Sequence, residues 1–167
     1  ECIQGEAKLL SPHEVRVNGR TLTTRSIILA TGGAPAIPKL PGLDHVQVLH
    51  TDNVWELRKK PERLIVLGGG PIGCELGQCF ARLGVRVTQV QRANQLLPKE
   101  DEDAARILEE RLRCEGVDVR LEASAADVTV KEGRKFLRVE KDGKSKEIEF
   151  DEILVAVGRK PRTSGFG

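Results

Sequence analysis

Hydrophobic residues near the start of the chain occur in short alternating runs, a pattern typical of β-strands with one exposed face. Between two of these runs, the pair Asn18-Gly19 predicts a two-residue hairpin turn. A continuous apolar run at Ser26–Ala30 predicts a further strand that is buried on both faces. Residues 34–42 are punctuated by prolines and predict an extended loop. The alternating strands are predicted at Ala7–Leu10, Glu14–Val17 and Arg20–Thr23.

After a short predicted helix around Trp55, the pattern changes to strands that alternate with helices. The second of the longer helices is expected to bury Ala105, Ile107, Leu108 and Leu112 as one apolar stripe. Such an order of strand and helix predicts a parallel sheet. The predicted elements are a strand at Arg63–Leu67, a helix from Gly70 to about Leu83, a strand at Val85–Val90, a helix from Glu100 to about Gly116 and a strand at Val117–Leu121.

The last part of the chain returns to strands. Two Gly-containing turns, Glu132-Gly133 and Asp142-Gly143, separate three alternating runs and predict an antiparallel β-meander. A buried strand at Ile153–Val157 follows and ends in Gly158. The meander strands are predicted at Val128–Val130, Lys135–Val139 and Lys146–Phe150.

The turn between the first buried strand and its helix has the sequence Gly68-Gly69-Gly70-Pro71-Ile72-Gly73, a G-x-G-x-x-G pattern in the strand–turn–helix context that the motif requires. Gly68 permits the tight turn, Gly70 allows backbone to approach a pyrophosphate, and Gly73 lets the helix pack against the strand. Amides at the helix start favour a phosphate. The motif predicts a nicotinamide dinucleotide site; a glycine turn without a ligand is the alternative. The fold class is α/β, with a Rossmann-like parallel sheet and a β-meander.

The end of the second strand of this unit carries Gln91 and Arg92. Many NAD sites place an acidic residue here, where it hydrogen-bonds the ribose hydroxyls. Without the carboxylate, a 2′-phosphate meets no repulsion, and a guanidinium binds phosphate through two parallel hydrogen bonds. These residues favour NADP over NAD, while a solvated Arg92 with no role leaves NAD open.

Composition narrows the functional classes. The net charge is only +2 with 31% charged residues, so no basic field indicates nucleic acid or an anionic membrane as partner. No apolar run approaches the roughly 20 residues of a spanning helix. The four cysteines lack zinc-ligand spacing, and no metal site is predicted. On one helix, Cys74 and Cys79 point about 140° apart, so we expect free thiols and a reducing, cytoplasmic location.

The chain resembles the flavin-dependent pyridine nucleotide–disulfide oxidoreductases, which include dihydrolipoamide dehydrogenase, glutathione reductase and mercuric reductase. The motifs that carry the resemblance occur in the family's order over essentially the whole chain: Ile27–Gly33, Leu40-Pro41-Gly42, Leu67–Glu75 and Asp151–Pro161. The pair Gln91-Arg92 is most similar to the NADP-using glutathione and mercuric reductase branches.

The resemblance implies a nicotinamide domain inserted in a partial FAD domain. Residues 1–57 would be the second half of the FAD-binding domain, residues 58–150 the NAD(P)-binding domain, and residues 151–167 the return to the FAD-binding domain. It further implies that Ala30, Thr31 and Gly32 lie near FAD. By the same resemblance, Glu75 lies near the nicotinamide, and Val128 and Gly158 line the dinucleotide.

Several family features are missing from the sequence: the first glycine motif for FAD, the redox-active C-x4-C pair, and the C-terminal dimerisation domain with its acid–base histidine. The chain also has no methionine. We therefore expect a central piece of a longer FAD-dependent protein, a homodimer through its C-terminal domain. The piece itself is expected to hold no catalytic residue and no FAD. An NADH oxidase, peroxidase or ferredoxin reductase, and a non-catalytic nucleotide sensor, are the alternatives.

Overall fold

The structure is a computed structural model that describes all 167 residues. It divides into two compact units, one formed by Glu1–Ala34 with Lys160–Gly167 and the other by Pro35–Arg159. Strands β4 (Gly33–Pro35) and β13 (Arg159–Pro161) each span a point where the chain passes from one unit to the other. The domain boundaries expected from the sequence remain predictions.

The first unit contains an antiparallel sheet in the order β1-β2-β3. Its strands are β1 (Ala7–Ser11), β2 (Glu14–Val17) and β3 (Arg20–Thr23), which confirms the three predicted runs. Asn18 and Gly19 both have positive φ, at 51° and 76°, as the predicted hairpin turn requires.

The predicted buried strand at Ser26–Ala30 is wrong. These residues form no strand, and Ile28 and Leu29 expose 91% and 53% of their surface. A strand needs a neighbour for its backbone amides and carbonyls, and residues 26–30 pair with no strand of this unit, although β1 and β3 each pair only with β2. The apolar side chains of the run therefore stay exposed.

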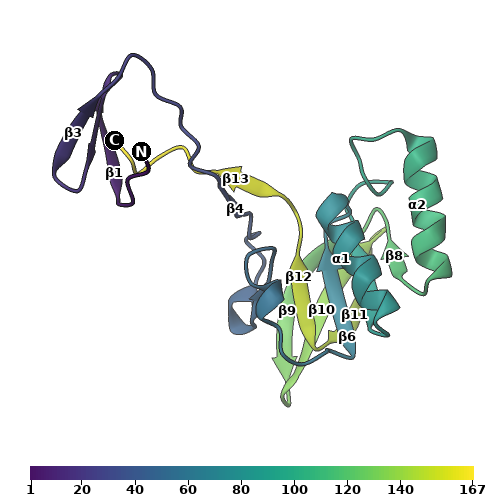
Figure 1. The fold of residues 1–167 in the computed structure, drawn as a ribbon. Coiled ribbons are helices and arrows are strands. Elements are labelled where there is room, and N and C mark those ends of the chain that lie inside the picture. The colour runs from purple at the N-terminus through teal and green to yellow at the C-terminus, as the bar shows by residue number, and fades with distance from the viewer. The chain divides into compact units, whose positions relative to one another are not determined.

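The second unit is built on a five-stranded parallel sheet in the order β5-β12-β6-β7-β8 (Figure 1). Helices α1 and α2 lie on one side of the sheet, and the antiparallel meander β9-β10-β11 lies on the other. The 3-10 helices η1 (Leu43–His45) and η2 (Val54–Glu56) flank β5, so the helix predicted around Trp55 is a single short turn. The bounds are β5 (Val48–Leu49), β6 (Arg63–Leu67), α1 (Pro71–Arg82), β7 (Arg86–Val90), α2 (Glu102–Cys114), β8 (Asp118–Arg120), β9 (Ser124–Lys131), β10 (Arg134–Lys141), β11 (Lys144–Phe150) and β12 (Glu152–Val155).

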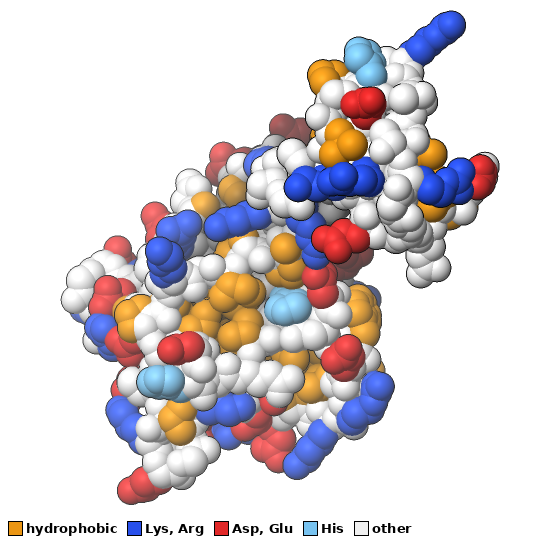
Figure 2. Space-filling view, turned by 90° about the vertical axis from the view of Figure 1, so that its left-hand side faces the viewer, with side chains coloured by type: hydrophobic (Ala, Val, Ile, Leu, Met, Phe, Trp, Pro, Cys, Tyr) orange, Lys and Arg blue, Asp and Glu red, His pale blue; other side chains and the backbone are white.

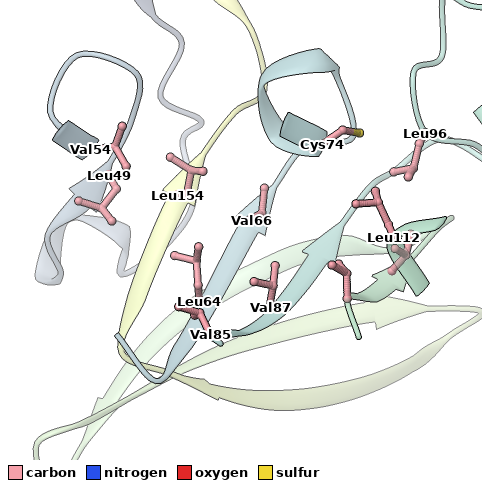
Figure 3. Close-up of a cluster of buried hydrophobic side chains, with 12 residues drawn as sticks. Leu49, Val54, Leu64, Val66, Cys74, Val85, Val87, Leu96, Leu112 and Leu154 are labelled. Atoms are coloured by element: carbon pink, nitrogen blue, oxygen red, sulfur yellow. The ribbon is translucent and has the colours of Figure 1, made fainter. Parts of the chain in front are cut away.

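Alternate side chains of the central strand β6 supply two separate cores. Leu64 and Val66 point toward the helices and pack in one cluster with Leu112 of α2 (Figure 3). Ile65 and Leu67 point the other way, into a cluster with residues of the meander. Because both faces are covered, the strand is continuously apolar, as expected for a parallel sheet.

The apolar stripe predicted on α2 is wrong at one position. Ala105 and Leu112 are buried, but Ile107 exposes 64% of its surface. At about 100° per residue, Ile107 lies about 200° from Ala105 and therefore on the opposite face.

No helix of the structure is both long and apolar enough to cross a bilayer. On the face shown in Figure 2, basic and acidic side chains are interspersed.

An ion-pair network joins the start of β6 to the residue that precedes β12. The carboxylate of Asp151 accepts hydrogen bonds from the Arg63 backbone amide at 2.8 Å and from Arg63 Nη2 at 2.6 Å. Arg63 Nη1 pairs with Glu149 Oε2 at 2.7 Å, so the guanidinium also holds the end of β11. The side-chain hydrogen bond from Arg63 lowers the pKa of Asp151. The chain's return from the meander is thereby fixed against the central strand.

We predict that Asp151→Asn destabilises the second unit by roughly 1–2 kcal/mol at pH 7, because Arg63 then donates to a neutral amide instead of a carboxylate. The pKa of Asp151 is lower in the folded than in the unfolded chain, so the Asp151 carboxylate stabilises the folded unit at pH values above about 4. This stabilisation is lost as the pH falls through the folded-state pKa. The difference between wild type and variant should therefore shrink from pH 7 to pH 3. Urea unfolding followed by helical circular dichroism measures it, because both α-helices belong to this unit.

Asp142→Asn is the matched control. Asp142 is exposed in the turn between β10 and β11 at φ 50°, a conformation that asparagine tolerates. Its stability should follow that of the wild type at every pH. An Asp151→Asn deficit that stays constant down to pH 3 would show that the Arg63 ion pair is not its source.

Candidate functional site

The glycine turn lies between the end of β6 and the start of α1 and leaves no room for side chains at two positions. Gly68 has φ 109°, its amide donates to Val90 O at 2.9 Å, and a Cβ there would lie 2.4 Å from Ala156 O. A Cβ on Gly73 would lie 2.3 Å from Gly68 O. These contacts give both glycines the roles that the sequence predicted for the turn and for helix packing.

Gly70 differs from its neighbours because it faces open space. A Cβ on Gly70 would meet no atom within 4 Å, and the residue caps α1 without a side-chain hydrogen bond. No acceptor in the chain takes the amides of Gly70, Ile72 or Gly73, and Pro71 has no amide hydrogen to offer. Three unpaired donors therefore lie at the positive end of a helix dipole, beside an open position at Gly70, which fits the pyrophosphate of a dinucleotide.

Gln91 and Arg92, the two residues predicted to favour NADP, are arranged differently from each other. Gln91 turns inward: its Oε1 accepts from the Gly69 amide at 3.2 Å, and its Nε2 donates to Gln95 O at 3.3 Å. Arg92 is exposed, and its side chain makes no hydrogen bond or ion pair. Of the pair, only Arg92 presents a free polar group at the carboxyl end of β7.

Two further residues hold the turn and were not predicted. Gln89 is fully buried, and its Nε2 donates to Gly68 O at 3.0 Å. Leu97 donates its amide to Gly69 O at 2.7 Å, so the loop after β7 is fastened onto the turn. Gln89 lies two residues after Val87 in β7 and therefore on the same strand face, where a polar residue among apolar ones is a visible signal for the first. The second is a backbone contact for which the sequence carries no signal.

The residues implied by the family resemblance occupy varied environments. Glu75 is exposed on α1 and has no partner, and Gly158 is exposed at φ 126°. Val128 is buried in the meander-side core, and its amide donates to Pro41 O at 2.8 Å. Ala30, Thr31 and Gly32 belong to the first unit, where the Thr31 hydroxyl donates to Arg162 O. Their roles remain predictions.

The cysteines are all free, and those of α1 lie in different surroundings. Cys74 is buried beneath the turn, where burial raises the pKa of its thiol, and Cys79 is exposed. The side chains thus point apart, as predicted from the helical spacing. The structure contains no group of three or more histidine, cysteine, aspartate or glutamate side chains placed to hold a metal ion.

A parallel sheet with a glycine turn and a helix start at its carboxyl end defines a Rossmann-like unit. A family model described as pyridine nucleotide-disulphide oxidoreductase matches residues 1–166. The chain belongs to this family.

Curated relatives agree with this assignment. The chain is 36% identical to a mercuric reductase of Staphylococcus aureus, over 98% of this chain and 30% of that protein. It is 37% identical to a dihydrolipoyl dehydrogenase of Thermus scotoductus, over 100% of this chain and 37% of the relative. A glutathione reductase of Burkholderia cepacia is 33% identical, over 100% of this chain and 35% of the relative. The chain thus spans about a third of the length of these relatives.

Among solved structures, the chain is similar to the HOCl-induced flavoprotein disulfide reductase RclA from Escherichia coli. The TM-score is 0.82 at 32% identity, and the match covers 97% of this chain and 37% of that one. The Rossmann-like fold class and the family resemblance inferred from the motifs are therefore confirmed. Members of this family use FAD and NAD(P)H.

We predict that Gly73→Ala destabilises the second unit by about 1–3 kcal/mol, because the new methyl group must displace the Gly68 carbonyl. Gly77→Ala on the same helix is the matched control. Its Cβ would meet its nearest neighbour at 3.7 Å, an ordinary contact, and alanine favours the helix by up to about 1 kcal/mol. Urea unfolding of both variants measures this; equal losses in stability would argue against the close approach at Gly73.

Proposed function

We propose that this chain binds a nicotinamide dinucleotide over the turn from Gly68 to Gly73. The observation that carries the proposal is the set of unpaired amides of Gly70, Ile72 and Gly73 around the open position at Gly70. The amides would bind the pyrophosphate, and the dipole of α1 favours its negative charge. When bound, the dinucleotide supplies a hydride, while the protein supplies binding and orientation.

For the choice between dinucleotides, we favour NADP over NAD. No carboxylate stands at position 91 or 92, and the guanidinium of Arg92 is free of any competing partner. A free guanidinium at the carboxyl end of β7 suits a 2′-phosphate, which it can bind through two hydrogen bonds. Because both ends of the Gln91 amide are already engaged, we assign the phosphate contact to Arg92 alone.

We infer that the whole protein is an FAD-dependent oxidoreductase that passes hydride from NAD(P)H through flavin to a disulfide-linked acceptor. The supporting observations are the family match and the reductase and dehydrogenase names of the relatives. Ala30, Thr31 and Gly32 would lie near FAD, with Glu75 near the nicotinamide and Val128 and Gly158 beside the dinucleotide. The protein would be a cytoplasmic homodimer, and this chain alone would be inactive.

Two other functions would use the same unit. A related flavoprotein of the oxidase, peroxidase or ferredoxin reductase type differs in its final electron acceptor; a C-x4-C pair in the full gene product would favour the disulfide reductases over it. A nucleotide sensor without catalysis has no need for FAD. Flavin absorbance of the purified full-length protein would argue against the sensor.

We predict that calorimetric titration of the chain gives a lower Kd for NADPH than for NADH. Arg92→Glu should raise the Kd for NADPH about tenfold or more, because a charge-assisted contact is replaced by repulsion, and should leave NADH within about twofold. Arg86→Glu is the matched control: it makes the same charge change at the opposite end of β7 and should alter neither Kd.

Equal Kd values for the two dinucleotides in wild type and in Arg92→Glu would reject the NADP assignment but would leave the proposed dinucleotide site standing. No binding of either dinucleotide by the folded chain would reject the site itself as an autonomous one.

A further inference from the structure

The peptide group between Gly68 and Gly69 is held from both sides by two glutamine side chains. Its carbonyl oxygen accepts from Gln89 Nε2 at 3.0 Å, and its amide donates to Gln91 Oε1 at 3.2 Å. The two glutamines are separated by one residue on β7 and its extension, so they project from the same face of the strand. The Gln89 side chain donates to the carbonyl edge of the peptide plane, and the Gln91 side chain accepts from its amide edge.

This peptide plane needs such a restraint. Both of its flanking residues are glycines, which reach positive and negative φ almost equally, so their own torsional preferences do not fix the plane. A rotated plane would turn the Gly68 carbonyl away from Gln89 Nε2 and would redirect the chain that leads to the Gly70 amide. The following carbonyl, Gly69 O, is held separately by the Leu97 amide at 2.7 Å and by Cys74 Sγ at 3.5 Å.

Gln89 makes this contact at an energetic disadvantage to the fold. The side chain is fully buried, and its Oε1 has no hydrogen-bond partner in the structure. A buried amide oxygen without a donor is costly, and an apolar residue would fill the same place without that loss. The neighbours Val87 and Val90 on β7 are apolar and buried. A role in folding alone therefore does not explain a glutamine at this position.

We propose that Gln89 and Gln91 are positioning residues that lock the Gly68–Gly69 peptide plane and so aim the amides of Gly70, Ile72 and Gly73 at the pyrophosphate. This inference rests on the proposed dinucleotide site. It changes the role of Gln91: the residue shapes the turn and does not read the ribose. Because NADPH and NADH share the pyrophosphate, losing the lock weakens both equally, whereas Arg92 acts on NADPH alone.

The test uses Gln89→Met and Gln91→Met, which keep a long unbranched side chain and remove the amide. Each should raise the Kd of NADPH and of NADH by the same factor, roughly three- to tenfold for one lost hydrogen bond. The urea midpoint of Gln89→Met should change little, because the unpaired Gln89 Oε1 disappears while Gly68 O loses its donor. Gln47→Met, an exposed glutamine in the same unit with no hydrogen bond through its side chain, is the control.

Gln91→Glu separates the lock from ribose recognition. Its carboxylate still accepts from the Gly69 amide, so NADH affinity should remain near wild type while NADPH affinity falls by charge repulsion. Hydrogen exchange of the Gly69 amide, measured by NMR without ligand, should be faster in Gln91→Met than in wild type and close to wild type in Gln91→Glu.

The outcomes separate the two proposals. Failure of the wild-type chain to bind either dinucleotide would overturn the dinucleotide site and, with it, the positioning role. Wild-type binding with unchanged Kd values in both methionine variants, or an unchanged Gly69 exchange rate in Gln91→Met, would overturn the lock alone. A loss of NADPH affinity without any loss of NADH affinity in Gln91→Met would return Gln91 to ribose recognition.

Discussion

Helix α1 packs closely against the end of β6 because Gly73 has no side chain. A Cβ there would lie 2.3 Å from the Gly68 carbonyl, so no other residue permits this packing without a shift of the turn. The close approach sets where α1 begins, and the start of α1 sets the direction of its unpaired amides. It also brings the Gly68 carbonyl within reach of Gln89 on β7. Sheet, helix and turn are therefore positioned through one contact.

The two faces of the parallel sheet serve different purposes. The helix side carries the turn, and its core includes Cys74 and Leu96, which lie directly beneath it. The meander side contributes no residue to the turn but covers the second face of β6 and β12, and it ends at the network of Arg63, Glu149 and Asp151. Covering both faces keeps the central strands rigid, and a rigid sheet is what fixes the ends from which the site is built.

Much of this architecture was predictable from local patterns. The hairpin turns, the strand–turn–helix unit and the meander all follow from glycine positions and short-range periodicity, which act within a few residues. The two errors have different sources. The apolar run at Ser26–Ala30 pairs with no strand and is exposed, and pairing is decided by residues distant in the sequence. Ile107 lies on the face of α2 opposite Ala105, which the helical angle of about 100° per residue fixes locally.

The site shows the same division. The glycine motif predicted the position of the turn, and Gly68 and Gly73 are required there by contacts inside the motif or with a neighbouring strand, whereas Gly70 faces open space. The sequence places Gln91 at the end of β7 without a carboxylate, and the structure adds that the side-chain amide of Gln91 binds the turn. Sequence position could not decide this, since an inward and an outward rotamer are equally compatible with the residue that directly follows a strand. A buried glutamine such as Gln89 is the signal to search for.

The place of β12 in the sheet has a consequence for the order in which the molecule acquires its shape during synthesis. β12 pairs with β6 although the whole of β7, β8 and the meander lies between them in the chain. Gly68 packs against the carbonyl of Ala156, and the Ala156 amide bonds to Leu67 at 2.8 Å. One wall of the glycine turn therefore comes from the far end of the unit. On the ribosome the turn is translated well before residue 156, and it reaches its final form only after residue 156 has emerged and docked.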